Sequence, residues 1–380
     1  MTVSALIVAA GSGSRMGGEL PKQFRPIGGK PVLAHAVDAL ASHRAVDVVK
    51  VVIGEGQRDL ARAALGDRNV ELVTGGAERS DSVRAGMEAS EADVILVHDA
   101  ARPFCPPDVI DRLLAALGAA EGAVPVLPVA DTLARAGTIL GEAVDRSQLV
   151  RVQTPQAFQF RSLTEAHAQW RGPSPTDEST VLRAAGRPVA VVDGDPLLEK
   201  LTTAADWQRA EAYLNSRLIP RTGLGFDVHA FAGDGPIMMG GIEIPHQRGL
   251  AGHSDADVIL HAITDALLGA GGLGDIGQHF PPNDPQWKGA DSAIFLAAAA
   301  KLVRDAGGTI DFVDCTVICE APKVGPYRDA MRSRVAAILD LPVSSVSIKA
   351  TTTERLGFAG RGEGIAAQAV TNVRMPPVNL

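Results

Sequence analysis

Two histidines and an aspartate in the second half of the chain have spacings that suit a metal site. Asp227 and His229 are two residues apart in a strand-like run, so their side chains point to the same side. His261 lies within Ser254–Leu268, a run with helical periodicity. Two imidazoles and one carboxylate leave a fourth position open, which is typical of catalytic zinc. A capped turn beside a core histidine would give the same pattern, and Asp265 either orients a ligand or is solvated.

A glycine-rich loop follows the first apolar run of the chain and could hold phosphate. Gly11 and Gly13 allow backbone N–H groups to approach a phosphate closely, and Arg15 and Lys22 supply positive charge. The loop lacks the G-K-[ST] of a P-loop, and Met16 stands where a dinucleotide-binding loop needs its third glycine. A tight surface turn with solvated charges is the alternative interpretation.

Two more polar segments follow strand-like runs in the first half. Gly75 and Gly76 precede a helical run that contains Ser82, and free N–H groups at a helix start suit an anion or a polar base edge. Asp99 and Arg102 come directly after another apolar run. An aspartate there could hold Mg²⁺ on phosphates, and the arginine could pair with phosphate. The two residues could instead form only a structural ion pair.

Residues 1–218 alternate between short apolar runs and amphipathic helical runs. The apolar runs are continuous, as expected for strands of a parallel sheet that is covered on both faces. We predict a doubly wound, Rossmann-like α/β domain with its site at the carboxyl ends of the strands. The expected strands are Val3–Ala9, Val48–Ile53, Val70–Val73, Val94–Val97, Ala123–Val126 and Val189–Val192, and the expected helices include Pro31–Ser42, Gln57–Leu65, Ser82–Ser90 and Pro107–Leu117.

A helical run over Ala204–Leu218 leads into the proline-containing segment Ile219–Gly223, where we place a domain boundary. The expected domains are residues 1–219 and 220–380. The second domain has an α+β pattern that resembles a β-α-β-β-α-β sandwich. Its expected elements are a strand over Leu224–Val228, a hairpin around Ile237–Ile244, helices over Ser254–Leu268, Ser292–Ala306 and Tyr327–Leu339, and strands over Ile310–Cys319, Val343–Ala350 and Ile365–Val373.

The composition excludes several classes of protein. The 380 residues suffice for two domains, and 46% hydrophobic with 21% charged residues is an ordinary globular balance. A net charge of -8 argues against a nucleic-acid partner. No apolar run reaches the roughly 18 residues that span a bilayer, and no basic segment precedes the first apolar run, as it would in a signal peptide. Three cysteines without C-x-x-C spacing fit reduced thiols, so we expect a soluble, cytoplasmic protein without a membrane partner.

The motifs of the first half resemble, in type and order, those of 2-C-methyl-D-erythritol 4-phosphate cytidylyltransferases. The resemblance covers nearly all of this half. It implies transfer of a cytidylyl group from CTP to methylerythritol phosphate, with release of diphosphate, in isoprenoid biosynthesis by the methylerythritol-phosphate pathway. The matching motifs are A-A-G-x-G-x-R-M with P-K-Q, G-G-x-x-R-x-D-S-V and H-D-A-A-R-P, together with the runs Val129–Thr132, Asp145–Arg146, Gln153–Gln156 and Thr176–Glu178.

This resemblance also implies roles for individual residues. Arg15 and Lys22 would stabilise negative charge on the α-phosphoryl group, and Arg146 and Lys200 would orient the substrate phosphate. Such roles agree with the need of phosphoryl-type transfer for positioning and charge neutralisation. The expected substrate-binding residues are Gly11 and Gly13 in the loop, Gly75, Gly76 and Ser82 at the cytosine, Asp99 with Mg²⁺ and Arg102 at the phosphates, and Thr132 and Thr154 near the acceptor.

One position departs from the family pattern. The family usually has Asn two residues before its late lysine, whereas Leu198 precedes Lys200 here and the acidic Glu199 adjoins it. An inactive first half that only supports the second is therefore one alternative hypothesis. A nucleotidyltransferase that acts on a sugar phosphate, with the same glycine-rich fold, is another.

The second half resembles 2-C-methyl-D-erythritol 2,4-cyclodiphosphate synthases over residues 222–374. The resemblance implies that 4-CDP-2-C-methyl-D-erythritol 2-phosphate is cyclised with loss of CMP. Zinc on Asp227, His229 and His261 would act as a Lewis acid and template. The matching motifs are G-F-D-V-H, A-G-H-S-D-A-D, G-D-I-G with F-P, E-A-P-K, and K-A-T-T-T-E with G-F and G-R-G-E-G.

Further expectations follow from this second resemblance. His253 and Thr352 would stabilise the transition state, and Glu354 would hold a second ion, Mg²⁺. The family forms homotrimers with sites between subunits, so we expect a homo-oligomer. The phosphorylation step between the two reactions requires a separate kinase. Substrate contacts are expected from Ser254, Asp275, Ile276, Gly277, Thr351, Thr353, Glu354, Phe358 and Arg361.

Overall fold

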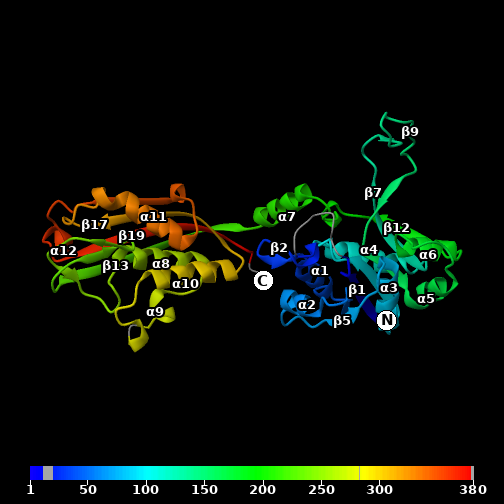
Figure 1. The fold of residues 1–380 in the computed structure, drawn as a ribbon, viewed down its shortest axis with the longest axis horizontal. Coiled ribbons are helices and arrows are strands. Elements are labelled where there is room, and N and C mark those ends of the chain that lie inside the picture. The colour runs from blue at the N-terminus through cyan, green and yellow to red at the C-terminus, as the bar shows by residue number, and fades with distance from the viewer. Residues whose placement is uncertain (12–19, 282, 378–380) are drawn as a thin grey trace. The chain divides into compact units, whose positions relative to one another are not determined.

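The computed structural model describes residues 1–11, 20–281 and 283–377. Its contacts divide the chain into two compact units, Met1–Tyr213 and Leu214–Leu380, each with its own sheet (Figure 1). Each unit also has its own buried hydrophobic core. Among the described residues, no helix combines the length and the apolar character that crossing a membrane requires.

The first unit contains an eight-stranded sheet with the order β10-β7-β11-β6-β1-β4-β5, and β12 pairs with β7 beside this path. β4, β1 and β6 run parallel to one another, whereas β11 is antiparallel to both of its neighbours. The predicted α/β class is confirmed, and the reversed strands make the sheet mixed. The strands are β1 (Val3–Val8), β4 (Val48–Ile53), β5 (Glu71–Thr74), β6 (Val94–Asp99), β7 (Gly122–Pro128), β10 (Val150–Val152), β11 (Gln156–Gln159) and β12 (Val189–Asp193).

Helices cover both faces of this sheet, as a doubly wound fold requires. Ala5 and Ile7 of β1 pack into the core that includes α1, α2 and α4, whereas Leu6 packs into the core that includes α3, α5 and α6. Successive residues of β1 therefore point into different cores, which explains its continuous apolar sequence. The helices are α1 (Val32–Ala41), α2 (Arg58–Leu65), α3 (Arg79–Glu88), α4 (Pro107–Ala116), α5 (Phe160–Gln169), α6 (Glu178–Ala184) and α7 (Ala204–Ser216).

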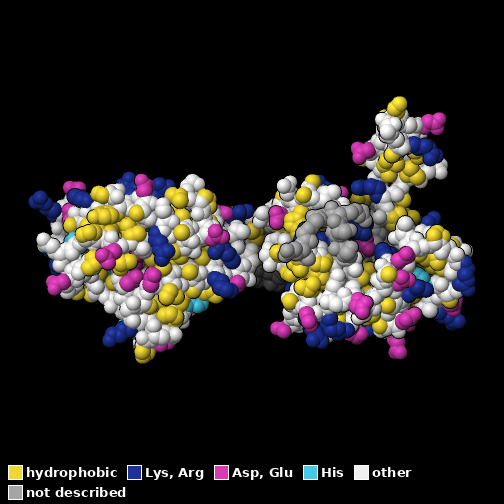
Figure 2. Space-filling view, in the orientation of Figure 1, with side chains coloured by type: hydrophobic (Ala, Val, Ile, Leu, Met, Phe, Trp, Pro, Cys, Tyr) yellow, Lys and Arg dark blue, Asp and Glu magenta, His cyan; other side chains and the backbone are white. Residues whose placement is uncertain are grey.

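A two-stranded arm leaves the sheet after β7 (Figure 1). It consists of β8 (Leu133–Ala134) and β9 (Ala143–Val144), which pair antiparallel. Ile139 and Leu140, between these strands, are each 84% exposed, and hydrophobic side chains lie on the surface of the arm (Figure 2). The arm therefore carries apolar surface that its own unit leaves uncovered.

The second unit contains a five-stranded sheet with the order β16-β13-β19-β17-β18. β13, β19 and β17 alternate in direction, β18 is parallel to β17, and the main core lies between this sheet and α8, α10 and α11. The strands are β13 (Ile219–Ala232), β14 (Ile237–Met239), β15 (Ile242–Ile244), β16 (Gly249–Leu250), β17 (Thr309–Ile318), β18 (Val346–Thr351) and β19 (Gly364–Met375), and the helices are α8 (Val258–Gly271), α9 (Ile276–His279), α10 (Ala293–Asp305), α11 (Arg328–Leu339) and α12 (Gly357–Gly360).

β13 extends beyond both ends of the predicted strand Leu224–Val228 and includes the segment where we placed the domain boundary. Residues 219–223 are the first residues of the strand and pair with residues 371–375 of β19. Gly223 and Gly225 lie against α8, and a Cβ at either position would overlap the backbone of that helix. Glycine at these two positions therefore lets α8 pack directly on the strand. The helix itself begins at Val258, later than predicted, because Asp257 caps it.

The two faces of β13 differ. Asp227 and His229 are partly buried on the side that faces α8, whereas Leu224, Phe226 and Val228 on the other side are 45–61% exposed. This alternation confirms that the side chains of Asp227 and His229 point to the same side. It also leaves one side of the strand apolar and uncovered within the chain.

Candidate active sites

The first candidate site is a cavity of about 330 Å³ at the carboxyl ends of β1 and β6. This is the edge of the sheet where open α/β folds bind their ligands. Predicted residues from five separate segments meet here, and the cavity is lined by Gly11, Lys22, Gly76, Ser82, Asp99 and Lys200, together with Gln23, Arg79 and Thr202, which sequence reasoning did not assign to the site.

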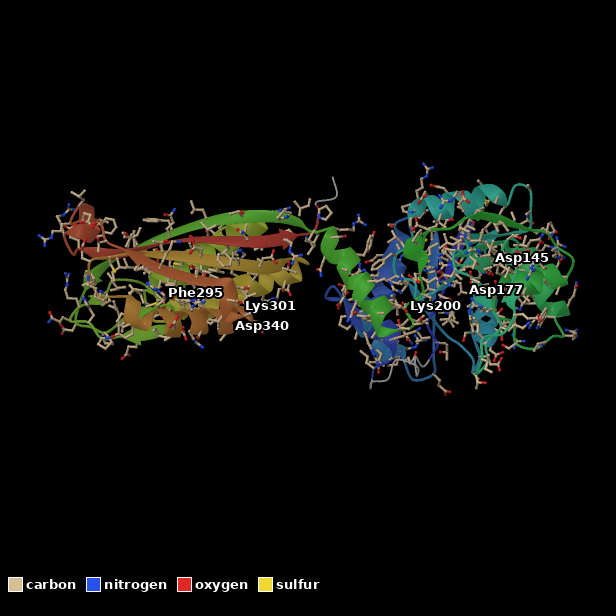
Figure 3. The ribbon with its side chains drawn as sticks, turned by 90° about the horizontal axis from the view of Figure 1, so that it is seen from above. Asp145, Asp177, Lys200, Phe295, Lys301 and Asp340 are labelled. Atoms are coloured by element: carbon tan, nitrogen blue, oxygen red, sulfur yellow. The ribbon has the colours of Figure 1, made fainter. Side chains whose placement is uncertain are left out.

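Asp99 lies at the end of β6 and is surrounded by cations. Its Oδ2 is 2.8 Å from Lys200 Nζ, its Oδ1 is 3.2 Å from Arg79 Nε, and Arg102 Nε is 3.8 Å from Oδ2. Burial opposes ionisation, yet the nearby Arg79 and Lys200 hold the pKa of Asp99 well below its usual range. The carboxylate is therefore charged at the cavity wall. Lys200 is labelled in Figure 3.

Arg79 and Glu178 form a buried ion pair beside this carboxylate. Arg79 Nη1 is 2.9 and 3.0 Å from the two carboxylate oxygens of Glu178, whose side chain has no exposed surface. Arg79 thus bridges Glu178 and Asp99. Both residues belong to motifs found in the sequence, but they are 99 residues apart, so the sequence did not predict their contact.

The glycine pair after β5 is shaped by close packing with α3. A Cβ at Gly75 would lie 2.5 Å from Ser82 Oγ and 2.8 Å from Val52 Cγ1, so a larger residue does not fit. Ser82 is buried, and its hydroxyl donates to the carbonyl of Glu78 at 3.1 Å. Gly76 and Ser82 line the cavity, while Gly75 fixes the turn that brings them there.

Thr154 supports Asp99 from behind. The backbone N–H of Asp99 donates to Thr154 Oγ1 at 3.0 Å, and that hydroxyl lies 3.2 Å from His98 Nδ1. Burial lowers the pKa of His98 to about 4, so this imidazole is neutral near pH 7. Thr154 is therefore a support of the cavity wall in this chain and is absent from its lining.

Leu198, which stands where the family usually has Asn, is part of the hydrophobic core. Its side chain is fully buried in the core on the α1 side of the sheet, and its carbonyl accepts a hydrogen bond from Arg102 Nη1. Arg102 is thereby held beside Asp99 and does not line the cavity. Lys200, two residues later, still reaches the cavity, so Leu198 leaves the position of the lysine intact.

Other residues of the predicted first site are placed elsewhere. Gly13 and Arg15 lie outside the described residues. Thr132 and Arg146 are exposed on the segment that includes the arm, and neither lines the cavity. The fold of one chain therefore brings Lys22 and Lys200 together but leaves Arg146 apart from them.

The second candidate site is the predicted metal cluster. The ligand atoms of Asp227, His229 and His261 all lie within 4.8 Å of one another. Asp227 Oδ2 is 2.9 Å from His229 Nε2 and 3.0 Å from His261 Nδ1, and the two nitrogens are 3.2 Å apart. Ligands of a tetrahedral zinc ion are separated by about 3.3 Å, given bonds near 2.0–2.1 Å, so the donor set fits such an ion.

The charges and protons of this cluster also suit metal binding. Burial opposes ionisation of Asp227, but the neighbouring imidazoles of His229 and His261 hold its pKa well below its usual range. His229 Nδ1 lies 2.7 Å from the carbonyl oxygen of Ala251, to which it donates its proton. The lone pair of its Nε2 is therefore directed at the other ligands, as a metal site requires.

The two aspartates that flank His261 in sequence have structural roles. Asp257 is fully buried and accepts hydrogen bonds from the backbone N–H groups of Gly240, Gly241, Ile259 and Leu260. Asp265 accepts from the N–H of Ile276 at 2.8 Å. It thus fixes the segment that starts α9, which is neither of the two roles that the sequence left open.

The other predicted residues of the second half fall into two groups. His253, Ser254, Asp275, Ile276 and Gly277 lie in segments that flank α8, and Asp275 caps α9 by accepting from Gln278 N–H at 2.9 Å. The second group follows β18, at the other edge of the sheet, and consists of Thr351, Thr352, Thr353, Glu354, Phe358 and Arg361.

The second group is far from the metal ligands of β13 within one chain. β19 and β17 lie between β13 and β18 in the sheet, so three strand spacings of about 4.8 Å separate them, or roughly 14 Å. Glu354 accepts from the hydroxyl of Thr352 at 3.1 Å, and Arg361 pairs with Glu363. Among the described residues, no hydrogen bond or ion pair joins this group to Asp227, His229 or His261.

Known proteins match the chain over both halves. A family model described as 2-C-methyl-D-erythritol 4-phosphate cytidylyltransferase matches residues 3–216, and the YgbB family model matches residues 220–374. A protein of Rhizorhabdus wittichii named bifunctional enzyme IspD/IspF is 61% identical, over 99% of both chains. The chain belongs to the bifunctional IspD/IspF family.

Other members of this family agree. A Rhodospirillum rubrum protein of the same name is 50% identical over 98% of this chain and 99% of its own. The solved structure of the bifunctional IspDF from Campylobacter jejuni is 33% identical, covers 99% of each chain and has a TM-score of 0.50. As a member of the IspD/IspF family, the chain is an enzyme of the methylerythritol-phosphate pathway with a cytidylyltransferase half and a cyclodiphosphate synthase half.

Proposed function

We propose that the cavity of the first unit is where CTP reacts with 2-C-methyl-D-erythritol 4-phosphate to give 4-CDP-2-C-methyl-D-erythritol and diphosphate. The observation that carries this proposal is the convergence of Lys22, Asp99 and Lys200 on one cavity from distant parts of the chain. Transfer of a nucleotidyl group needs fixed positive charge around the α-phosphate, and the two lysines supply it. Arg15 would add to this charge.

Asp99 would hold Mg²⁺ at the nucleotide phosphates. Its carboxylate is ionised and faces the cavity, and oxygen ligands of this kind suit the ion. Mg²⁺ bound there would neutralise charge on the triphosphate. Gly75, Gly76 and Ser82 would bind the cytosine, and Arg102 would remain a support of Asp99.

Thr132 and Arg146 would bind the acceptor phosphate from the segment that includes the arm. For this role the segment must lie against a nucleotide cavity of the kind described in the first unit. The exposed apolar side chains of the arm provide a surface that could be buried in such a contact. Thr154 would act indirectly, by fixing the backbone at Asp99.

The second unit would cyclise 4-CDP-2-C-methyl-D-erythritol 2-phosphate to 2-C-methyl-D-erythritol 2,4-cyclodiphosphate and CMP. The supporting observation is the three-ligand cluster, which fits zinc and leaves a position for a phosphate oxygen. Zinc there would supply Lewis-acid stabilisation of charge on that oxygen. His253 and Thr352 would stabilise the same charge by hydrogen bonds, and Ser254, Asp275, Ile276 and Gly277 would orient the substrate.

The second group of residues requires a second copy of the chain. Glu354, which would hold Mg²⁺, lies at the opposite edge of the sheet from His229, too far to share a substrate within one chain. A second copy whose segment after β18 lies beside the metal cluster of the first would complete the site. The uncovered apolar side of β13, with Leu224 and Phe226, supports burial between copies, and we propose the homotrimer of the family.

Further expectations remain with this proposal. We propose residues 1–219 and 220–380 as the two domains, a cytoplasmic location, and Thr351, Thr353, Phe358 and Arg361 as substrate contacts. A separate kinase must phosphorylate the first product before the second half can use it. Docking of such a kinase on this protein would be contradicted by purification from cells that retains no kinase.

A ³¹P NMR time course tests both halves. With CTP, methylerythritol phosphate and Mg²⁺, the wild type should give diphosphate and a cytidine diphosphate ester. Lys22→Ala should lose this turnover, while Lys301→Ala, which removes an exposed lysine of the second half, should keep it. Supplied separately with the phosphorylated intermediate, Lys22→Ala should still release CMP.

Two outcomes would contradict the proposal. Absence of turnover by the wild type, with CMP release intact, would make the first half a scaffold or a transferase for another acceptor. CMP release by Asp227→Ala at the wild-type rate would remove the metal cluster from the second reaction.

A further inference from the structure

His261 presents its two ring nitrogens to different surroundings. Nδ1 faces the metal cluster, 3.0 Å from Asp227 Oδ2 and 3.2 Å from His229 Nε2. Nε2 points the other way, 2.8 Å from Ser292 Oγ and 3.1 Å from Ser254 Oγ. A neutral imidazole has one proton, so whatever Nε2 contacts decides which nitrogen can bind a metal.

Ser292 is bonded so that its hydroxyl oxygen can only accept a hydrogen bond from His261. Its hydroxyl donates to Asp255 Oδ1, and its backbone N–H donates to Asp255 Oδ2 at 3.1 Å. An ionised carboxylate only accepts hydrogen bonds, so the single hydroxyl proton of Ser292 is already used. The oxygen of Ser292 is then an acceptor for Nε2–H of His261, and the lone pair of Nδ1 is left for a cation.

We propose that Ser292 and Asp255 are positioning residues that fix the proton and the ring orientation of His261 for metal binding. This inference rests on the proposal that Asp227, His229 and His261 hold a divalent cation. Neither positioning residue touches the metal position, and both act through His261. Metal-bound histidines generally donate their second N–H to a fixed acceptor. Here that acceptor is Ser292, which lies between His261 and the carboxylate of Asp255.

The packing of α10 supports this role. Ser292 is fully buried and is the N-cap residue directly before α10. Phe295, in the first turn of that helix, packs its ring 6.0 Å from the ring of His261. Phe295, a residue of α10, is labelled in Figure 3. One helix end therefore supplies both a hydrogen-bond acceptor for His261 and an apolar surface against its ring.

Two other bonds join the same segments without involving His261. The N–H of Gly289 donates to the carbonyl of His253 at 2.8 Å, and the N–H of Asp255 donates to the carbonyl of Ala290 at 3.1 Å. Neither bond depends on a side chain, so both persist when the hydroxyl of Ser292 is removed. A role of Ser292 in local structure alone would therefore leave metal affinity unchanged.

Metal affinity of the full-length metal-free protein tests the inference. Zinc binding is measured by competition with a chromophoric chelator for the wild type, Ser292→Ala, Ser292→Thr and the exposed control Ser333→Ala. We expect Ser292→Ala to bind zinc roughly 10–100-fold more weakly, as loss of such outer partners does elsewhere. Ser292→Thr, which keeps the hydroxyl, should recover most of the affinity, and Ser333→Ala should match the wild type.

A second variant and a spectroscopic readout cover the case in which Ser292→Ala does not fold. Asp255→Asn keeps the shape but removes the carboxylate, and it should also weaken zinc binding. In ¹H–¹⁵N spectra of the zinc-loaded wild type, the Nε2–H of His261 should be protected from exchange with solvent, and Asp255→Asn should lose much of this protection. A structural role would not change the exchange of this proton.

The results separate this inference from the proposed metal site. Wild-type affinity in folded Ser292→Ala and Asp255→Asn, or equal loss in Ser292→Thr and Ser292→Ala, would overturn the positioning role. Failure of the wild type to bind zinc, or equal binding by Asp227→Ala, would instead remove the metal site and the inference with it.

Discussion

Arg79→Met should destabilise the first unit more than any exposed charge change nearby. Arg79 forms a hydrogen-bonded ion pair with Glu178, whose side chain is completely buried. Arg79 also donates a hydrogen bond to Asp99. Methionine keeps much of the volume of the side chain but none of its charge. The substitution therefore leaves a buried carboxylate without a partner.

The magnitude follows from the burial of Glu178. Removing one partner of a buried ion pair typically costs about 3–5 kcal/mol, because the other charge stays desolvated and unpaired. In a unit of this size each kcal/mol lowers the melting temperature by about 2–4 °C, so the transition of the first unit should fall by roughly 6–20 °C. Arg84→Met removes another cation of α3. Because Arg84 is mostly exposed, this substitution should destabilise the unit by less than about 1 kcal/mol.

Differential scanning calorimetry of the wild type, Arg79→Met, Arg84→Met and Arg79→Met/Glu178→Gln measures these changes. The double variant should recover much of the loss, because the glutamine is neutral when buried. Loss below about 1 kcal/mol in Arg79→Met, or equal losses in Arg79→Met and Arg84→Met, would refute the reasoning. A double variant no more stable than Arg79→Met would show that Glu178 is not the source of the penalty.

The loss should also depend on pH with a defined sign. Burial raises the pKa of Glu178 above its ordinary value of 4.5, and Arg79 opposes this rise. Without Arg79 the folded-state pKa of Glu178 rises further, so the folded state binds a proton more readily than the unfolded state. The deficit of Arg79→Met should therefore be largest above the folded-state pKa and should shrink as the pH falls toward 4.5. A deficit that grows on acidification would contradict this assignment.

Other predictions address packing, protonation and thiol reactivity. Gly225→Ala should destabilise the second unit by on the order of 3 kcal/mol in urea unfolding, because its methyl group overlaps helix backbone, whereas Gly269→Ala, where nothing lies nearby, should be neutral or stabilising. Burial lowers the pKa of His167 to about 4, so the first unit should lose up to about 3 kcal/mol as the pH falls from 6.5 to 4, and His167→Leu should abolish that part of the slope. A thiol reagent at pH 8 should react slowly with the native protein, because burial raises the pKa to about 12 for Cys105 and Cys315 and to about 11 for Cys319. After unfolding, the same reagent should react with all three thiols. Rapid reaction of the native protein would show that a cysteine is exposed.

Local spacing predicted the parts of each site that lie on one element. Asp227 and His229 share a side of β13 because side chains alternate along any strand. The continuous apolar run of β1 predicted a strand buried on both faces, and the glycine pair Gly75 and Gly76 was correctly placed before a helix, α3. These features depend on neighbouring residues only, so periodicity and residue type were enough to find them.

Pairing between distant segments corrected other expectations. The proline-containing segment 219–223 was predicted only as a domain boundary, and pairing with residues 371–375 makes it a strand. Asp265 was expected to orient a metal ligand or to be solvated, yet it accepts a hydrogen bond from the backbone N–H of Ile276. Hydrogen bonds to backbone from another part of the chain leave no trace in local sequence patterns.

The sequence by itself determined the two fold classes, the glycine turns, the Asp-x-His strand and, through motif order, the pair of activities. Tertiary structure alone decided that Lys200 meets Asp99 across 101 residues, that Arg79 is tied to the buried Glu178, and that Ser292 holds the far side of His261. The physical reason is the range of the interactions: alternation and turn chemistry act between neighbours, whereas a shared cavity or an ion pair forms only after packing has brought remote segments into contact.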